Sequence, residues 1–124
     1  MPFPSPDGSQ IMYYYEAADG EKSLIRADNT DGSAWIRITK NVPLTQPKLE
    51  WLVNDQYLLL LDEQGQQNQI LDLINLDFKP AMPDRAPQTL VVASPEGNRL
   101  VYLANVNGQA KLSVWNVAEN KLDK

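Results

Sequence analysis

The sequence contains no cysteine and no histidine among its 124 residues. Without cysteine the chain forms no disulfide and offers no thiolate ligand. Without histidine it lacks the commonest general base and the commonest transition-metal ligand. A serine–histidine or cysteine–histidine triad is therefore excluded within this chain. We expect no catalytic residue, no metal site and no cofactor.

Long runs of one residue class are also missing. The chain has 16 acidic and 11 basic residues, and no run of Lys or Arg forms a patch that tracks phosphates, so nucleic-acid binding is disfavoured. Apolar runs such as Leu58 to Leu61 are far too short to cross a bilayer, so no membrane insertion is expected. The N-terminus lacks the basic and apolar regions of a secretory signal. We expect a cytoplasmic protein if the chain is complete, and a periplasmic or extracellular one if a signal was removed.

A motif repeats along the chain. Ser5 to Gly8 reads SPDG and Ser94 to Gly97 reads SPEG, and each is followed, after two polar residues, by an apolar strand-like run. A weaker middle copy, Leu49 to Leu61, has Trp51 where the others have proline or alanine. The copies begin at residues 4, 51 and 93. Repeats of this length that hold several short strands are typical of propeller blades.

Turn residues separate short alternating runs inside each repeat. Asp19-Gly20 and Asn107-Gly108 stand between such runs, and these pairs predict hairpins because glycine accepts positive φ at little cost. In the middle repeat we expect strands at Tyr57–Leu61 and Ile70–Leu76, and the prolines of Lys79 to Gln88 indicate an irregular connector. No segment has a helical period of useful length. We assign structural turns to Pro6, Asp7, Gly8, Asp31, Gly32, Pro95, Glu96 and Gly97.

These motifs resemble the repeat of TolB-like β-propellers, in which Ser-Pro-Asp-Gly precedes two β-runs and an Asp-x-x-Asp-Gly turn, here Asp28 to Gly32. The segment Lys111 to Leu122 is similar to the third-strand segment of WD-repeat propellers, with Trp115-Asn116 in place of Trp-Asp. The resemblance implies an all-β fold of four-stranded antiparallel blades, about three per chain. It implies one module over residues 1–124, with approximate blades 1–46, 47–88 and 89–124. The tryptophans within β-runs are expected to pack between blades. They are Trp35, Trp51 and Trp115.

Three blades do not close a ring, because closed propellers have roughly four to eight. Two outer blade faces are then apolar and exposed. The first repeat has only Pro2 to Pro4 before its turn and the third ends at Leu122 to Lys124, so one chain's end is expected to complete another chain's beginning. We therefore expect half of a six-bladed ring closed by a homodimer, or a part of a longer propeller. An open stack of sheets is the third possibility.

Several side chains could in principle bind a metal, catalyse a reaction or bind an anion, but each also has a simpler structural interpretation. Asp28 to Gly32 is oxygen-rich but lacks the distal glutamate of an EF-hand, which favours a polar hairpin turn over a calcium loop. The carboxylates of Asp7, Asp62-Glu63 and Glu96 show no spacing typical of a catalytic pair. Arg85 in the connector is either a site for a carboxylate or phosphate partner or a solubilising charge, and we favour solubility.

The expected function is a non-enzymatic platform for a protein or ligand, with the partner docking where the Asp7-Gly8 turn and the Lys79–Gln88 connector cluster. Two alternatives stay open. The chain is the propeller portion of a peptidase or hydrolase whose catalytic domain is absent, since Gly-x-Ser-x-Gly does not occur here. Otherwise it is a purely structural fragment.

Overall fold

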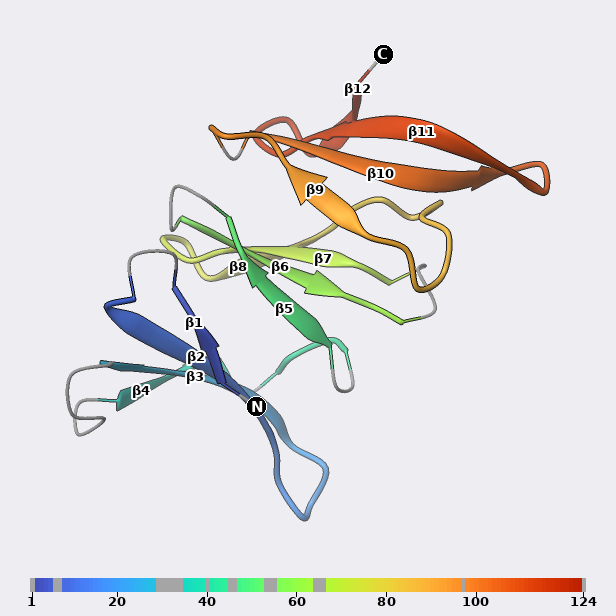
Figure 1. Cartoon of the computed structure of the whole chain (residues 1–124). Helices are drawn as coiled ribbons and strands as arrows, with labels where there is room; N and C mark the ends of the chain where they lie inside the picture. The colour runs from blue at the N-terminus through green and yellow to red at the C-terminus, as the bar shows by residue number, and fades with distance from the viewer. Residues whose placement is uncertain are drawn as a thin grey trace.

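The computed structural model describes residues 2–5, 8–28, 35–39, 41–44, 47–52, 56–63, 67–96 and 98–123. These residues form three four-stranded antiparallel sheets, stacked one upon another, and no helix (Figure 1). The first sheet comprises β1 (Pro2–Pro4), β2 (Gln10–Glu16), β3 (Lys22–Asp28) and β4 (Trp35–Thr39). The second comprises β5 (Lys48–Trp51), β6 (Tyr57–Leu61), β7 (Gln69–Asp72) and β8 (Asp77–Pro80). The third comprises β9 (Val91–Ala93), β10 (Arg99–Val106), β11 (Gln109–Asn116) and β12 (Lys121–Asp123).

The predicted all-β fold of four-stranded blades is confirmed. Strands pair in chain order within each sheet. The first sheet contains its own innermost strand, β1, and the third contains its own outermost strand, β12, although each has only three residues. The expectation that one chain's end must complete another chain's sheet was therefore wrong, because every sheet takes all four strands from this chain.

The three sheets share one register, which is set by the turn between their first two strands. The amide N–H of Ser5 donates to the carbonyl of Gln10 at 2.8 Å, and Ser94 donates to Arg99 in the same way. Leu52 repeats this bond to Tyr57 at 3.1 Å. The bond spans five residues in each case, so residues 10, 57 and 99 occupy equivalent positions.

The serine of the repeated motif closes this turn with its side chain. Ser5 Oγ accepts a hydrogen bond from the amide of Gln10 at 3.1 Å, and Ser94 Oγ accepts one from the amide of Arg99 at the same distance. Leu52 stands at the equivalent position and has no hydroxyl. The turn length is therefore kept in all three sheets, whereas the side-chain bond is made only in the first and third.

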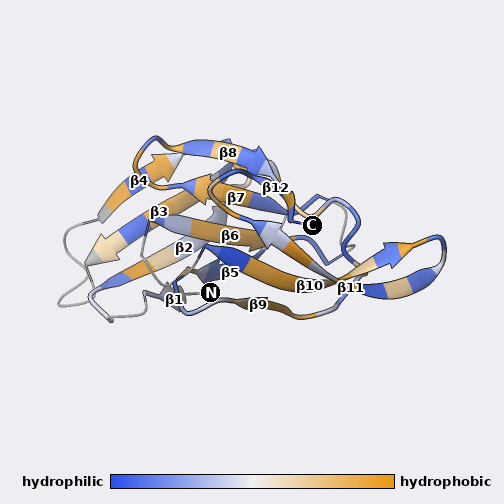
Figure 2. Ribbon diagram, turned by 90° about the horizontal axis from the view of Figure 1, so that it is seen from above, coloured by the Kyte–Doolittle hydropathy of each residue, from blue (hydrophilic) through white to orange (hydrophobic). Residues whose placement is uncertain are grey.

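The core consists of two layers of apolar side chains, one between each pair of neighbouring sheets. Most of the β6 ribbon, in the middle sheet, is coloured as hydrophobic (Figure 2). β6 contributes to both layers. Leu58 and Leu60 pack toward the first sheet, and Leu59 and Leu61 pack toward the third, because side chains alternate across a strand. All four leucines are buried. The unbroken leucine run is thus explained by a sheet that is covered on both faces.

The structure corrects the strand expected at Ile70–Leu76. β7 ends at Asp72, and β8 begins at Asp77. The carboxylate of Asp72 accepts hydrogen bonds from the amides of Ile74 at 2.9 Å and Asn75 at 3.4 Å, which stops the strand and forms a turn. Burial acts to raise the pKa of Asp72, but these hydrogen bonds outweigh it and hold the pKa below its usual value.

The same turn follows β11. Asn116 Oδ1 accepts a hydrogen bond from the amide of Glu119 at 2.9 Å, as Asp72 does from the amide of Asn75 three residues on. In both turns the fifth residue has positive φ, 54° at Leu76 and 52° at Asn120. Asn tolerates this conformation, but in other L-residues it brings the side chain too close to the backbone. Leu76 therefore carries local strain that Asn120 largely avoids.

We expect Leu76→Asn to raise the free energy of unfolding by about 0.5–1 kcal/mol, because asparagine adopts positive φ at lower cost. Urea denaturation followed by circular dichroism measures the change. Ile74→Asn is the matched control, since Ile74 lies in the same turn without positive φ and is exposed. It should change stability by less than about 0.5 kcal/mol. Equal effects of the two substitutions would refute the assignment of strain to Leu76.

Candidate functional site

The connector between β8 and β9, residues 81–90, joins the second sheet to the third. Within it, the amide of Ala86 donates to the carbonyl of Leu103 at 2.8 Å, and the carbonyl of Asp84 accepts from the amide of Asn105 at 2.7 Å. Arg85 forms an isolated antiparallel bridge with Ala104. The segment predicted to be an irregular loop is therefore partly paired to β10, next to the hairpin end of that strand.

Arg85 is buried, with 5% of its surface exposed. Its Nη1 donates to the carbonyl of Asp62 at 2.8 Å and to Asn68 Oδ1 at 3.1 Å, and its Nη2 donates to the carbonyl of Thr89. Asn68 is buried too, and its amide group donates to the carbonyl of Met82 at 3.0 Å. The predicted role of Arg85 as a solubilising charge was wrong. Arg85 instead ties the connector to the loop between β6 and β7.

The environment of Arg85 does not favour a free anion. Burial lowers the pKa of the Arg85 guanidinium, while the carboxylates of Glu63, Asp62 and Glu50 act in the opposite direction and favour its charged form. These carboxylates partly neutralise the guanidinium before any ligand arrives. The arrangement therefore stabilises the connector and is poorly suited to a phosphate or carboxylate partner.

Tyr102, on β10 of the third sheet, also holds the connector in place. Its hydroxyl donates to Asp84 Oδ1 at 2.9 Å, and its ring is buried between the second and third sheets. Burial, together with this hydrogen bond and the negative charge of Asp84, raises the pKa of Tyr102 well above its usual range. Tyr102 therefore remains a neutral hydrogen-bond donor throughout the physiological pH range.

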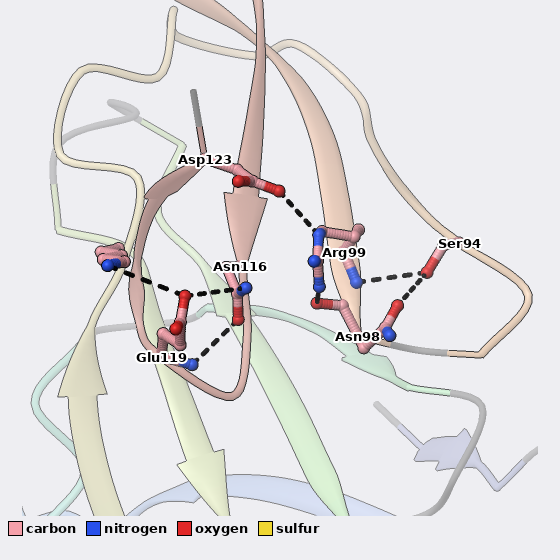
Figure 3. Close-up of polar contacts among 7 residues, drawn as sticks. Ser94, Asn98, Arg99, Asn116, Glu119 and Asp123 are labelled. Carbon is pink, nitrogen blue, oxygen red and sulfur yellow. Dashed lines mark hydrogen bonds and ion pairs between the residues drawn. The ribbon is translucent and has the colours of Figure 1, made fainter.

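A second group of polar contacts lies at the other end of the third sheet (Figure 3). Arg99 Nε on β10 pairs with Asp123 Oδ2 on β12 at 2.7 Å. Ser94 Oγ donates to Asn98 Oδ1 at 3.0 Å, and Asn116 donates to Glu119 at 3.2 Å. Both side chains of the ion pair are partly exposed, so the pair contributes at most about 1 kcal/mol. These contacts hold β12 and the adjacent turns in place.

Neither polar group has the composition of a metal centre. In the part of the chain that the structure describes, no cluster of three or more His, Cys, Asp or Glu side chains is placed to hold a metal ion. Among the same residues, no helix is long and apolar enough to span a membrane.

Two of the three tryptophans can be placed by their side chains. Trp115 is buried in the layer between the second and third sheets, and its indole N–H donates to Asn120 Oδ1 at 3.1 Å. Asn120 in turn donates to the carbonyl of Pro80 on β8 at 2.9 Å, which links the third sheet to the second. Trp51 is half-buried against the layer between the first and second sheets. Trp35 belongs to β4, but its side chain lies outside the described residues.

The turn residues assigned from the sequence are only partly described. Gly8 has φ of 74°, a conformation that favours glycine. Pro95 and Glu96 are exposed in the turn after β9. The remaining assignments lie outside the described residues. They are Pro6, Asp7, Asp31, Gly32 and Gly97.

The turn at Gly8 and the connector do not share a surface. The Gly8 turn precedes β2 at Gln10, whereas β2 ends at Glu16 in the β2–β3 hairpin, so the two lie at opposite ends of the first sheet (Figure 1). Because residues 10 and 99 are equivalent, the far end of β10 corresponds to the hairpin end of β2. The connector pairs with Leu103 and Asn105, close to the β10–β11 hairpin. The expectation that one partner docks where both segments cluster was therefore wrong.

Among the described residues, apolar side chains also gather on the two outer sheet faces. We call the outer face of the third sheet the surface formed by Val92, Val101, Leu103, Leu112 and Val114, which cross-strand pairing places on one side. We call the outer face of the first sheet the surface formed by Ile11, Tyr13, Tyr15 and Ile25. Leu112 is 69% exposed and Tyr15 is 53% exposed. Apolar surfaces of this kind mark interaction sites.

Arg85→Met should lower the free energy of unfolding by about 2–4 kcal/mol, because it removes the guanidinium donor to two partly buried carbonyls, those of Asp62 and Thr89. It also removes one donor to Asn68 Oδ1, which still accepts from the amide of Asp62. Urea denaturation measures the loss. Arg37→Met is the matched control, since the Arg37–Glu21 pair is exposed and should contribute less than about 1 kcal/mol. If both substitutions cost the same, the buried arginine is not a structural anchor.

Tyr102→Phe should reduce the loss of stability at high pH. Unfolded tyrosine deprotonates near pH 10, whereas folded Tyr102 keeps its proton to higher pH, so the free energy of unfolding falls as pH rises above about 10. Thermal melts at pH 8 and pH 11 should show a smaller decrease for Tyr102→Phe than for the wild type. Tyr15→Phe, at an exposed position, should keep the wild-type decrease. The same decrease in all three proteins would rule out this role of Tyr102.

Comparison with known proteins identifies the fold. No protein-family model and no curated protein sequence matches this chain. Among solved structures, it is similar to TolB from Acinetobacter baumannii, with TM-score 0.64 and 15% identity over 98% of this chain and 31% of that one. A putative TolB from Agrobacterium tumefaciens gives TM-score 0.64 and 16% identity over 98% of this chain and 43% of the other.

Two further solved structures are similar to this chain in fold. The tricorn protease matches with TM-score 0.65 and 9% identity over 93% of this chain and 12% of the protease. A chain of a nidogen/laminin complex matches with TM-score 0.61 and 13% identity, over 98% of this chain and 44% of that one. The chain spans less than half the length of each of these β-propeller proteins. Its three stacked sheets have the fold of three blades of a TolB-like β-propeller.

Proposed function

We propose that the chain is a non-enzymatic β-propeller module that acts as a protein-interaction platform through the outer faces of its first and third sheets. The observation that carries this proposal is the set of apolar side chains on those faces. Leu112 and Val92 on the third sheet are more than half exposed, although each lies in a strand of a well-formed sheet. Water-exposed leucine and valine in contiguous positions are typical of surfaces that bind another protein.

The partner that suits such a face is another blade. The outer faces become buried if the ring is completed, either by self-association or by further blades of a longer propeller. The solved structures with this fold support the longer-propeller form, because each contains more chain than these three blades. The nidogen/laminin complex is a further case in which a protein with this fold is found with a protein partner.

A second candidate function comes from the tricorn protease, a peptidase that shares this fold over 93% of the present chain. In that case the chain is the propeller portion of a peptidase or hydrolase whose catalytic domain is absent here. The two functions can be distinguished by mixing the isolated chain with a hydrolase domain and measuring the rate of peptide cleavage. A propeller portion should alter peptide cleavage by a hydrolase domain that it binds, whereas an interaction platform should leave the cleavage rate unchanged.

Association through the third sheet should depend on Leu112. We expect the wild type to associate to about twice its chain mass of 14.0 kDa, and Leu112→Lys to remain at one chain, because a buried lysine without a partner is costly. Light scattering coupled to size exclusion measures the mass. Ile74→Lys is the matched control, since Ile74 is 72% exposed but lies in the β7–β8 turn, away from the outer faces.

Two results would count against this proposal. Equal effects of Leu112→Lys and Ile74→Lys on association would show that the outer face of the third sheet is not the binding surface. A wild type that stays at the mass of one chain at every concentration would contradict self-association and would leave the longer propeller as the form in which the faces are covered.

A further inference from the structure

We infer that the outer face of the third sheet binds the outer face of the first sheet of a second copy, head to tail, so that two chains close one ring of six blades. This inference rests on the proposed function and names the partner. It also specifies which two surfaces meet.

The outer face of the third sheet repeats a face that already binds a blade inside this chain. In the second sheet, Leu59 on β6 pairs across to Ile70 on β7, and both are buried against the third sheet. The shared register makes Val101 and Val114 their equivalents, and these two also pair directly across strands. The third sheet therefore presents to solvent the kind of surface that the second sheet buries under its neighbour.

The outer face of the first sheet is the complementary half. Pro2 pairs with Tyr13 as Val91 pairs with Tyr102, so Tyr13 is the equivalent of Tyr102. Tyr102 and its neighbours on that side of β10 pack against the second sheet. The first sheet thus presents the kind of surface with which the third sheet binds the blade before it. Within one chain this kind of interface forms twice, between the first and second sheets and between the second and third. The outer faces of the first and third sheets are the two halves that have no neighbouring sheet in the chain.

Like-to-like association lacks this precedent. Two outer faces of the third sheet would bring together Leu112 and Val92 with their own copies, a pairing that neither internal interface contains. Head-to-tail association places the outer face of the third sheet against the outer face of the first sheet, the same pairing of faces that the internal interfaces have. This continuity with two interfaces already formed favours a second copy oriented head to tail over a symmetric contact.

The number of blades then decides how many copies take part. Each chain contributes three sheets, so two copies give six blades, which lies within the range of roughly four to eight for closed propellers. Three copies would give nine, which lies above that range. A head-to-tail interface closes into a ring when the rotation from blade to blade permits, and otherwise it grows into an open filament. A closed pair has two equal interfaces and leaves neither outer face uncovered.

A mixing experiment tests the head-to-tail arrangement. Leu112→Lys alters the outer face of the third sheet, and Tyr15→Lys alters that of the first. Both side chains are exposed in the single chain, so both variants should fold, as circular dichroism can verify. We expect each variant alone to stay at the mass of one chain and the wild type to reach twice that mass. An equimolar mixture should again reach twice the mass, because one interface of the mixed pair contains two unaltered faces.

Each other outcome overturns the inference in a recognisable way. If Tyr15→Lys alone still doubles its mass, or if the mixture does not recover, association is not head to tail, although the proposed interaction function stands. A mass that keeps increasing with concentration beyond two chains would show a filament in place of a ring. A wild type at the mass of one chain would overturn the inference and would leave only the longer propeller form of the proposed function. Ile74→Lys in place of either variant should retain the doubled mass.

Discussion

A β-sheet with two apolar faces must be covered on both sides, and this constraint governs the whole chain. β6 shows it most directly, since Leu58 and Leu60 are buried under the first sheet and Leu59 and Leu61 under the third. The second sheet satisfies the constraint within the chain. The first and third sheets satisfy it on one side only. Their outer faces are therefore a necessary consequence of stacking three similar units, and the proposed interactions follow from the same constraint as the core.

The sheets can be compared residue by residue because their turns have the same length. Leu52 makes the backbone hydrogen bond that Ser5 and Ser94 make, without the serine hydroxyl that supports it in the other two sheets. Burial of Leu52 in the layer between the second and third sheets replaces the side-chain hydrogen bond as the source of stability there. Tertiary packing thus preserves a turn whose local sequence signal is weak.

The sequence was sufficient to predict the blade fold because alternating runs and Asn-Gly or Asp-Gly turns are local signals. Asn107 and Gly108 adopt positive φ, as their hairpin requires. The turn after Asp72 was missed because Leu73, Ile74 and Leu76 are apolar and extend the strand-like pattern. Asn116 lies at the equivalent position at the end of β11 and closes the same kind of turn, so a comparison of the two repeats could have indicated the turn after Asp72. Arg85 was misjudged for a different reason, since two of its three partners lie 17 and 23 residues away and only the fold brings them together.

The buried Arg85 network has a structural consequence beyond the stability of the connector. Replacing all members of a buried polar network by apolar side chains of similar volume is often neutral or stabilising, although removing one member alone is costly, so the network is better explained by the geometry that it specifies. Arg85 holds the connector against the second sheet, while Asp84 on the same connector holds Tyr102 of the third. The network therefore helps to set the angle between the second and third sheets. Because head-to-tail stacks close into a ring only at a suitable rotation per blade, a connector that sets this angle also influences whether association ends at a ring or continues as a filament.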